Sequence, residues 1–157
     1  MRILLLAATL AAIAVPAAGQ AVDQDRLCVT DPAACPLLEQ VGVDAWSQLD
    51  FTAMSFADGI QGMEFHCNFY GTMVRDGSDD VLVEAICEEP GFKYPDLISI
   101  APWDETRVQV GSAYELQRAL VANMSGEAVD TGAANEGQAA GITLYSRCDN
   151  LNALPRD

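Results

Sequence analysis

The sequence has very little histidine and little positive charge. Among its 157 residues His66 is the only histidine and Lys93 the only lysine, and eight Lys and Arg residues face 23 Asp and Glu, for a net charge of −15. Such a chain repels nucleic-acid phosphates and anionic lipids, so we expect neither as a partner. The same charge favours a cationic protein, peptide or small ligand.

Motifs for catalysis and for cofactor binding are also missing. The chain contains no G-x-S-x-G segment, no phosphate-binding loop and no recognised spacing of metal ligands. His66 stands next to Cys67 in an expected strand, where successive side chains point to opposite faces, so the two do not form a reactive pair. We therefore expect no enzyme activity, no catalytic residues, no cofactor and no metal.

One long hydrophobic run lies at the amino end. Arg2 precedes the apolar stretch 3–15, and small residues follow Pro16. About 13 apolar residues suit an export signal and fall short of the roughly 20 that span a bilayer. The pattern predicts a signal peptide at residues 1–21, cleaved after Gly19 or Ala21. Residues 22–157 are then expected to form a single disulfide-stabilised globular domain, periplasmic or secreted, without a membrane anchor.

Residues 64–89 predict a β-hairpin whose register can be derived from its side chains. A turn centred on Gly77 places Cys67 opposite Cys87, and Gly71 opposite Val83, with apolar residues throughout that face. His66 then pairs with Glu88 on the other face. Opposed Cβ atoms on antiparallel strands lie close to disulfide distance, so this register predicts a Cys67–Cys87 bridge.

The other three cysteines leave their connectivity open. Cys28 and Cys35 flank an Asp31-Pro32 turn, so we expect them to form a second bridge and to leave Cys148 as a free thiol. In the main alternative, Cys148 bonds to Cys28 or Cys35 and joins the two ends of the chain. Sequence alone does not choose among these pairings.

The clearest helix signal begins at Ser112. Ser112 and Glu115 match a capping box, and Leu116, Leu120 and Met124 repeat along one face, which predicts a helix packed on the core. A shorter helix is expected from Pro36 to Gly42. Residues 125–141 are rich in Gly and Ala and predict a long loop.

The expected fold class is α+β: a single small domain, mainly an antiparallel sheet, with one packed amphipathic helix. A small β-barrel or sandwich with an accessory helix is the alternative. Strands are expected at residues 51–56, 97–100, 106–110 and 141–148, and residues 88–95 are expected to form a loop because prolines interrupt them.

Four aromatic residues are candidates for a recognition surface: Tyr70, Phe92, Tyr94 and Trp103. Aromatic anchors surrounded by polar groups are typical of binding patches. The leading hypothesis is therefore an exported, non-enzymatic domain that binds a protein, peptide or small ligand. Two alternatives are a thiol-dependent redox or covalently attached protein that uses Cys148, and a structural component of the cell envelope.

Overall fold

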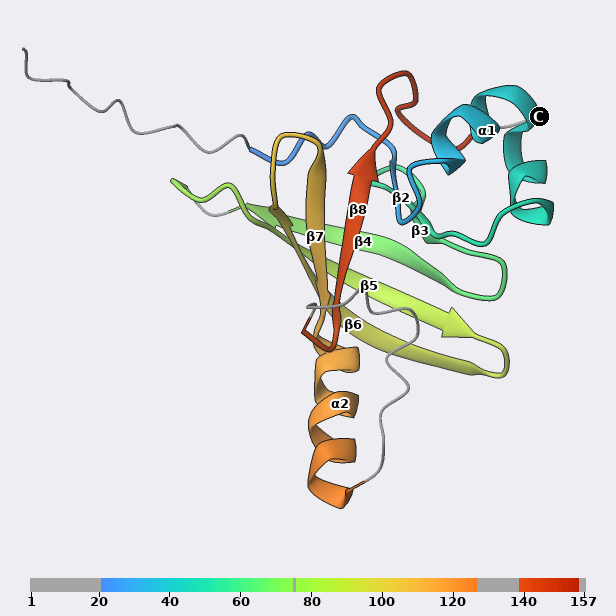
Figure 1. The fold of residues 1–157 in the computed structure, drawn as a ribbon. Helices are drawn as coiled ribbons and strands as arrows, with labels where there is room; N and C mark the ends of the chain where they lie inside the picture. The colour runs from blue at the N-terminus through green and yellow to red at the C-terminus, as the bar shows by residue number, and fades with distance from the viewer. Residues whose placement is uncertain (1–20, 75, 127–138, 156–157) are drawn as a thin grey trace, which may run out of the picture.

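The computed structural model describes residues 21–74, 76–126 and 139–155. Its eight strands form a closed antiparallel barrel in chain order, with two α-helices and one 3₁₀ helix outside it (Figure 1). The elements are β1 (Cys28–Val29), α1 (Ala34–Val41), η1 (Gly42–Ser47), β2 (Ala53–Ser55), β3 (Gly59–Gln61), β4 (His66–Val74), β5 (Val81–Glu89), β6 (Phe92–Pro102), β7 (Arg107–Ser112), α2 (Ala113–Ser125) and β8 (Ile142–Arg147).

The barrel has one extensive side and one short side. Strands β4, β5 and β6 are nine to eleven residues long, whereas β1, β2 and β3 have two or three residues each. This architecture matches the alternative expectation of a small barrel with an accessory helix. The primary α+β expectation holds only for the antiparallel sheet and the single long helix, because the sheet closes on itself instead of leaving one face for a helix to cover.

The β4–β5 hairpin has the predicted register over its first half. Cys67 lies opposite Cys87, and His66 lies opposite Glu88 with His66 Nε2 3.5 Å from Glu88 Oε2. Between Phe69 and Gly71 the register shifts by one residue, so the prediction is wrong beyond that point and Gly71 pairs with Glu84 instead of Val83. The cause is a β-bulge, in which one strand carries an extra residue, here Tyr70.

Residues 88–89 belong to β5 and residues 92–95 to β6, so the expectation of a loop over 88–95 is wrong except at the turn of residues 90–91. Pro95 pairs with Ile86 of β5, while β7 pairs with β6 only from Ile98 onward. Pro95 therefore lies in a part of β6 that has a strand on one side only. A proline is tolerated there because no neighbouring strand needs its missing amide hydrogen.

Two hydrophobic clusters lie on the two sides of the short strands. The barrel interior holds the larger cluster, which includes Cys28, Cys67 and Cys87. The second cluster, called here the cap cluster, packs α1 and η1 against the outside of the barrel and comprises Leu27, Val29, Ala34, Leu38, Ala45, Phe51, Ala53 and Cys148. Alternation along the chain explains the division, since Leu27 and Val29 face the cap and Cys28 faces the interior.

The disulfides are Cys67–Cys87 and Cys35–Cys148. The first is the predicted bridge. The predicted Cys28–Cys35 bridge is wrong, because Cys28 points into the barrel while Cys35 belongs to the cap side. Cys148 is consequently not a free thiol, and the reduced cysteine is Cys28.

Helix α2 begins where the capping signal predicts. The Ser112 hydroxyl accepts a hydrogen bond from the Glu115 amide at 3.0 Å, and Gly126 ends the helix in a left-handed conformation. The predicted core stripe is wrong, however: Leu116, Leu120 and Met124 are 49%, 57% and 89% exposed. The helix extends past the end of the barrel (Figure 1), so most of it has no strand to pack on.

The predicted signal peptide falls almost entirely on residues 1–20, which lie outside the described residues, as does most of the predicted loop at 127–138. Both stay predictions.

Candidate functional site

A surface groove of about 600 Å³ lies where α2 leaves the barrel. Its floor is the outer face of β5 and β6, and the first turns of α2 form one side. The lining residues are Tyr70, Glu84, Ala85, Ile86, Pro95, Asp96, Leu97, Ala113, Tyr114 and Gln117. We call this hollow the outer-face groove.

The strand register explains why the floor of the groove is apolar at the surface. Along β5 the side chains of Val83, Ala85 and Cys87 are buried in the barrel, so Glu84 and Ile86 point outward. Ile86 lies opposite Pro95, and Glu84 lies opposite Leu97. The outward rows of two neighbouring strands therefore form a continuous apolar floor that contains one carboxylate.

Glu84 is part of this floor and has a glycine on its β4 side. Gly71 of β4 is its partner in the register, and a methyl group added at Gly71 would lie 3.1 Å from Glu84 Oε2. The carboxylate therefore occupies the space that a side chain at position 71 would need. Glu84 forms no ion pair or hydrogen bond with any other described residue, so its charge is available to a ligand.

Tyr70 stands beside the groove because of the β-bulge. As the extra residue of β4, it has no direct partner on β5, and it is 70% exposed. The neighbouring positive charge is already neutralised: the Lys93 ammonium lies 2.5 Å from Glu88, which lowers the pKa of Glu88 and raises that of Lys93 through their hydrogen bond. The groove therefore combines an exposed aromatic ring with a carboxylate that no described side chain neutralises.

Asp96 lines the groove, but its carboxylate is already hydrogen-bonded to the start of α2. Its carboxylate accepts hydrogen bonds from the Ser112 hydroxyl at 2.6 Å and from the Tyr114 amide at 3.0 Å. A negative charge at this helix end also interacts favourably with the helix dipole. Asp96 thus fixes the position of α2 beside the groove, and Glu84 is left as the carboxylate that can receive a cation.

The four predicted recognition aromatics do not converge on one surface. Tyr70 is at the groove, and Phe92 is half exposed and stacks on Tyr94 with ring centroids 5.4 Å apart. Tyr94 is buried, and burial is the main reason that its pKa is raised, so it does not belong to an exposed surface as predicted. Trp103 follows the opposite end of β6, an 11-residue strand about 35 Å long.

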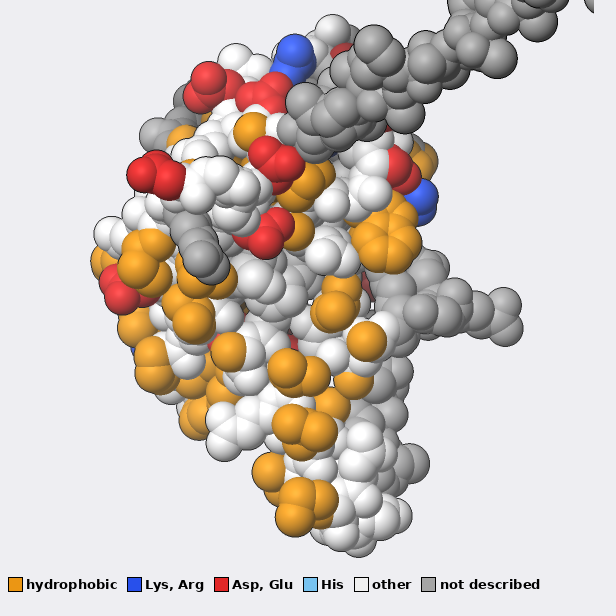
Figure 2. All heavy atoms as spheres, turned by 90° about the vertical axis from the view of Figure 1, so that its left-hand side faces the viewer, with side chains coloured by type: hydrophobic (Ala, Val, Ile, Leu, Met, Phe, Trp, Pro, Cys, Tyr) orange, Lys and Arg blue, Asp and Glu red, His pale blue; other side chains and the backbone are white. Residues whose placement is uncertain are grey.

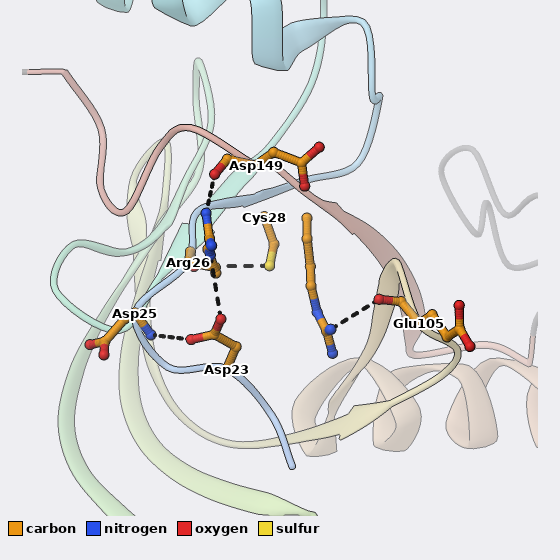
Figure 3. A network of polar contacts seen from close by, with 7 residues as sticks. Asp23, Asp25, Arg26, Cys28, Glu105 and Asp149 are labelled. Carbon is orange, nitrogen blue, oxygen red and sulfur yellow. Dashed lines mark hydrogen bonds and ion pairs between the residues drawn. The ribbon is translucent and has the colours of Figure 1, made fainter. Parts of the chain in front are cut away.

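The surroundings of Cys28 do not favour a reactive thiol. Its side chain is 2% exposed, and burial raises its pKa to about 11 although the Arg147 charge opposes that shift. Arg26, Asp23 and Asp149 form a polar network at the adjoining surface (Figure 3). Two nitrogens of Arg147, Nε and Nη2, are buried and have no hydrogen-bond partner among the described residues. A thiol held neutral in this way is a poor nucleophile.

Sequence reasoning missed most of the groove. The predicted hairpin register puts Glu88 on the outer face, and alternation along the same strand puts Glu84 and Ile86 there too, as observed. Leu97 and the residues of α2 were not connected with them. A signal was present, because Leu97 alternates with buried Ile98 along β6. That signal was not connected with α2, because the apolar side of α2 was expected to pack on the core.

The described residues contain no group of three or more His, Cys, Asp or Glu side chains placed to hold a metal ion. Within the same residues, no helix has the length and hydrophobicity that crossing a membrane requires. Comparison of the chain with family models, curated proteins and solved structures gives no match.

Proposed function

We propose that the protein is an exported, non-enzymatic binding module whose outer-face groove holds a cationic group of its ligand against Glu84. The observation that carries the proposal is a carboxylate that has no partner among the described residues and lines an apolar, aromatic-edged hollow of about 600 Å³. Ligand sites commonly have this composition, with apolar walls for affinity and a few polar groups for orientation.

The charges of the described residues support a cation rather than an anion. Each described Lys or Arg side chain already contacts an acceptor: Arg26, Lys93, Arg107 and Arg118 contact carboxylates, and Arg147 contacts the Glu105 carbonyl. Arg147 is the one of them without a carboxylate partner, and its two unpaired nitrogens are buried away from the groove, so an anionic ligand in the groove would find no free positive group among them. With a net charge of −15, the whole chain also attracts cations over long range.

Export to the periplasm or to the medium is part of this proposal. Two disulfides are compatible with an oxidising compartment, where such bonds persist. The amino-terminal sequence, with Arg2 before an apolar run, is the second support.

The test is a titration with 4-phenylbutylamine, which offers an apolar body and an ammonium group, followed by the amide NMR signals of the protein. We expect the signals of Tyr70, Glu84 and Leu97 to shift, and Glu84→Gln to weaken binding about three- to fivefold, as loss of a partly exposed ion pair predicts. Glu105→Gln is the matched control, since it removes the same charge in the β6–β7 turn.

The neutral analogue 4-phenylbutanol should bind wild type about as weakly as the amine binds the Glu84→Gln variant. Equal binding of the amine to wild type, Glu84→Gln and Glu105→Gln would show that Glu84 does not receive the cation. Shifts confined to residues outside the groove would refute the site itself.

A further inference from the structure

Helix α2 presents an apolar side that the rest of the described chain leaves uncovered. Leu116, Leu120 and Val121 are between 49% and 59% exposed, and Met124 is 89% exposed. Of the helix residues, all of which are described, Ala119 alone is buried. Figure 2 shows apolar side chains gathered toward the lower end of the molecule, where α2 lies in Figure 1, and carboxylates mainly in the upper half.

This apolar side is continuous with the outer-face groove. Ala113 and Gln117 line the groove. Residues 120, 121 and 124 follow Ala113 by seven, eight and eleven positions, the spacing that returns to the same side of an α-helix. The groove and the exposed side of α2 therefore form one surface, which we call the docking face, about 20 Å long over the 13 residues of α2.

The chain that follows α2 has the wrong composition to cover this face. Residues 127–138 contain one large apolar side chain, Val129. They also contain three acidic residues and no basic one, namely Glu127, Asp130 and Glu136. By composition, the segment that follows α2 in sequence is therefore acidic and has almost no apolar side chain that could pack on the helix.

The charge of the docking face selects its occupant. Arg118 is its nearest basic residue on α2 and is neutralised by Glu115 at 2.9 Å, while Glu84 has no partner within the part of the chain that the structure describes. A second copy of the chain would bring another net charge of −15 against the first. The occupant must carry positive charge to complement Glu84 and apolar side chains to cover α2. A partner with both apolar and basic side chains does this, since its charges steer association and its apolar side buries the exposed leucines.

We propose that the docking face binds a basic amphipathic helix of a partner protein, with apolar residues packed on Leu120, Val121 and Met124 and a Lys or Arg placed at Glu84. This inference rests on the proposed function and adds the class of ligand to it. A small cation would occupy only the groove and leave the apolar side of α2 exposed. A helix of about four turns is long enough to cover both the groove and α2.

The probe is a fluorescein-labelled synthetic peptide of about 18 residues with Leu on one helical side and Lys on the other. Its control has the same composition with the leucines distributed around the helix. We expect the amphipathic peptide to bind wild type at least about tenfold more tightly than its control, because both peptides gain equally from charge but one alone has an apolar side.

The decisive variant is Leu120→Gln/Met124→Gln, which keeps residues of good helix propensity on α2. We expect about tenfold weaker binding of the amphipathic peptide and unchanged binding of 4-phenylbutylamine. Met63→Gln is the matched control, since Met63 is 65% exposed and lies between β3 and β4. This control should bind both probes like wild type.

The possible failures are distinguishable. If the amine binds at Glu84 but the two peptides bind equally, or the α2 variant binds the peptide normally, the proposed function survives and the helix inference is overturned. If wild type is a dimer that the α2 variant converts to monomer, the occupant is a second copy and the inference is again overturned. If the amine does not bind, the proposed function itself fails.

Discussion

At the scale of single residues, Cys28 shows how position within a strand determines chemistry. The Leu27 carbonyl accepts a hydrogen bond from the Cys148 amide at 2.8 Å. The reduced Cys28 follows Leu27 directly in sequence, so its backbone lies close to that of the disulfide-bonded Cys148. Yet the Cys28 side chain belongs to the barrel interior and Cys148 to the cap cluster. The intervening backbone separates thiol from disulfide, and thiol–disulfide exchange requires direct attack on a sulfur.

We expect the Cys28 thiol to resist iodoacetamide at pH 8 in the native protein and to react once the chain is unfolded. A pKa of about 11 leaves well under about 1% of it as thiolate at that pH, and burial blocks the reagent in addition. Intact mass after alkylation, with and without denaturant, measures this directly. Rapid native labelling would contradict the buried, protonated state.

Residue-level prediction succeeded where contacts are local and failed where they are not. The Cys67–Cys87 pair followed from alternation and a turn, both visible within 26 residues of sequence. The Cys35–Cys148 pair has a sequence separation of 113 and depends on how the barrel closes, which local patterns do not specify. Glu84 could be placed on the outer face, but its partner Gly71 could not, because a bulge has no strong sequence signal.

At the scale of elements, α2 is stabilised at its start more than along its length. Ser112 and Asp96 together satisfy the amides of Glu115 and Tyr114, and the Asp96 carboxylate also accepts the Ser112 hydroxyl. In a capping box the Glu115 side chain would accept a hydrogen bond from the Ser112 amide. Here that amide donates to the Gly141 carbonyl at 2.9 Å, and Glu115 forms an ion pair with Arg118. Asp96 on β6 adds a further cap at the Tyr114 amide, which sequence spacing near the helix could not indicate.

Substituting Asp96→Ala should lower the free energy of unfolding by about 1–2 kcal/mol, and Ser112→Ala by about 1 kcal/mol, because each removes a cap from the same helix end. The loss of unfolding free energy in the double variant should be smaller than the sum of the two single losses, since the Ser112 hydroxyl donates a hydrogen bond to Asp96. Urea unfolding followed by far-UV circular dichroism measures all three variants. Strict additivity would mean that Asp96 and Ser112 act independently.

The sequence correctly predicted that α2 has an apolar side, but wrongly predicted that this side packs on the core. Hydrophobic periodicity indicates that a helix has an apolar side, but not whether the domain or a partner covers that side. Here β7 ends at Ser112, where the helix begins, and the barrel ends with it. Only the closed topology reveals that α2 has no sheet beneath most of its length.

At the scale of the whole molecule, the two disulfides have different tasks. Cys67–Cys87 joins strands that are already neighbours in a hairpin. Cys35–Cys148 joins the helix α1, near the start of the described chain, to the residue after the last strand, and so holds the cap cluster on the barrel. Trp46 belongs to this cap, where its ring stacks on Phe51 at 5.2 Å and its indole nitrogen donates to the Phe51 carbonyl.

Removing Cys35–Cys148 should therefore cost more stability than removing Cys67–Cys87. In the chain-entropy model a loop with a sequence separation of 113 contributes about 4–5 kcal/mol, against about 3 kcal/mol for a separation of 20. The variants are Cys35→Ala/Cys148→Ala and Cys67→Ala/Cys87→Ala, each in a Trp103→Phe background so that Trp46 is the remaining tryptophan. Guanidinium unfolding is followed by Trp46 fluorescence and by circular dichroism.

In the Cys35→Ala/Cys148→Ala variant, the Trp46 signal should change at lower denaturant than the circular dichroism, because the cap loses its covalent attachment before the barrel strands separate. In the Cys67→Ala/Cys87→Ala variant the two signals should change together, since that bridge lies within the barrel. Coincident transitions in both variants, with the larger loss for Cys67→Ala/Cys87→Ala, would contradict this division. The barrel and its cap would then unfold as one unit whose stability depends mainly on the hairpin.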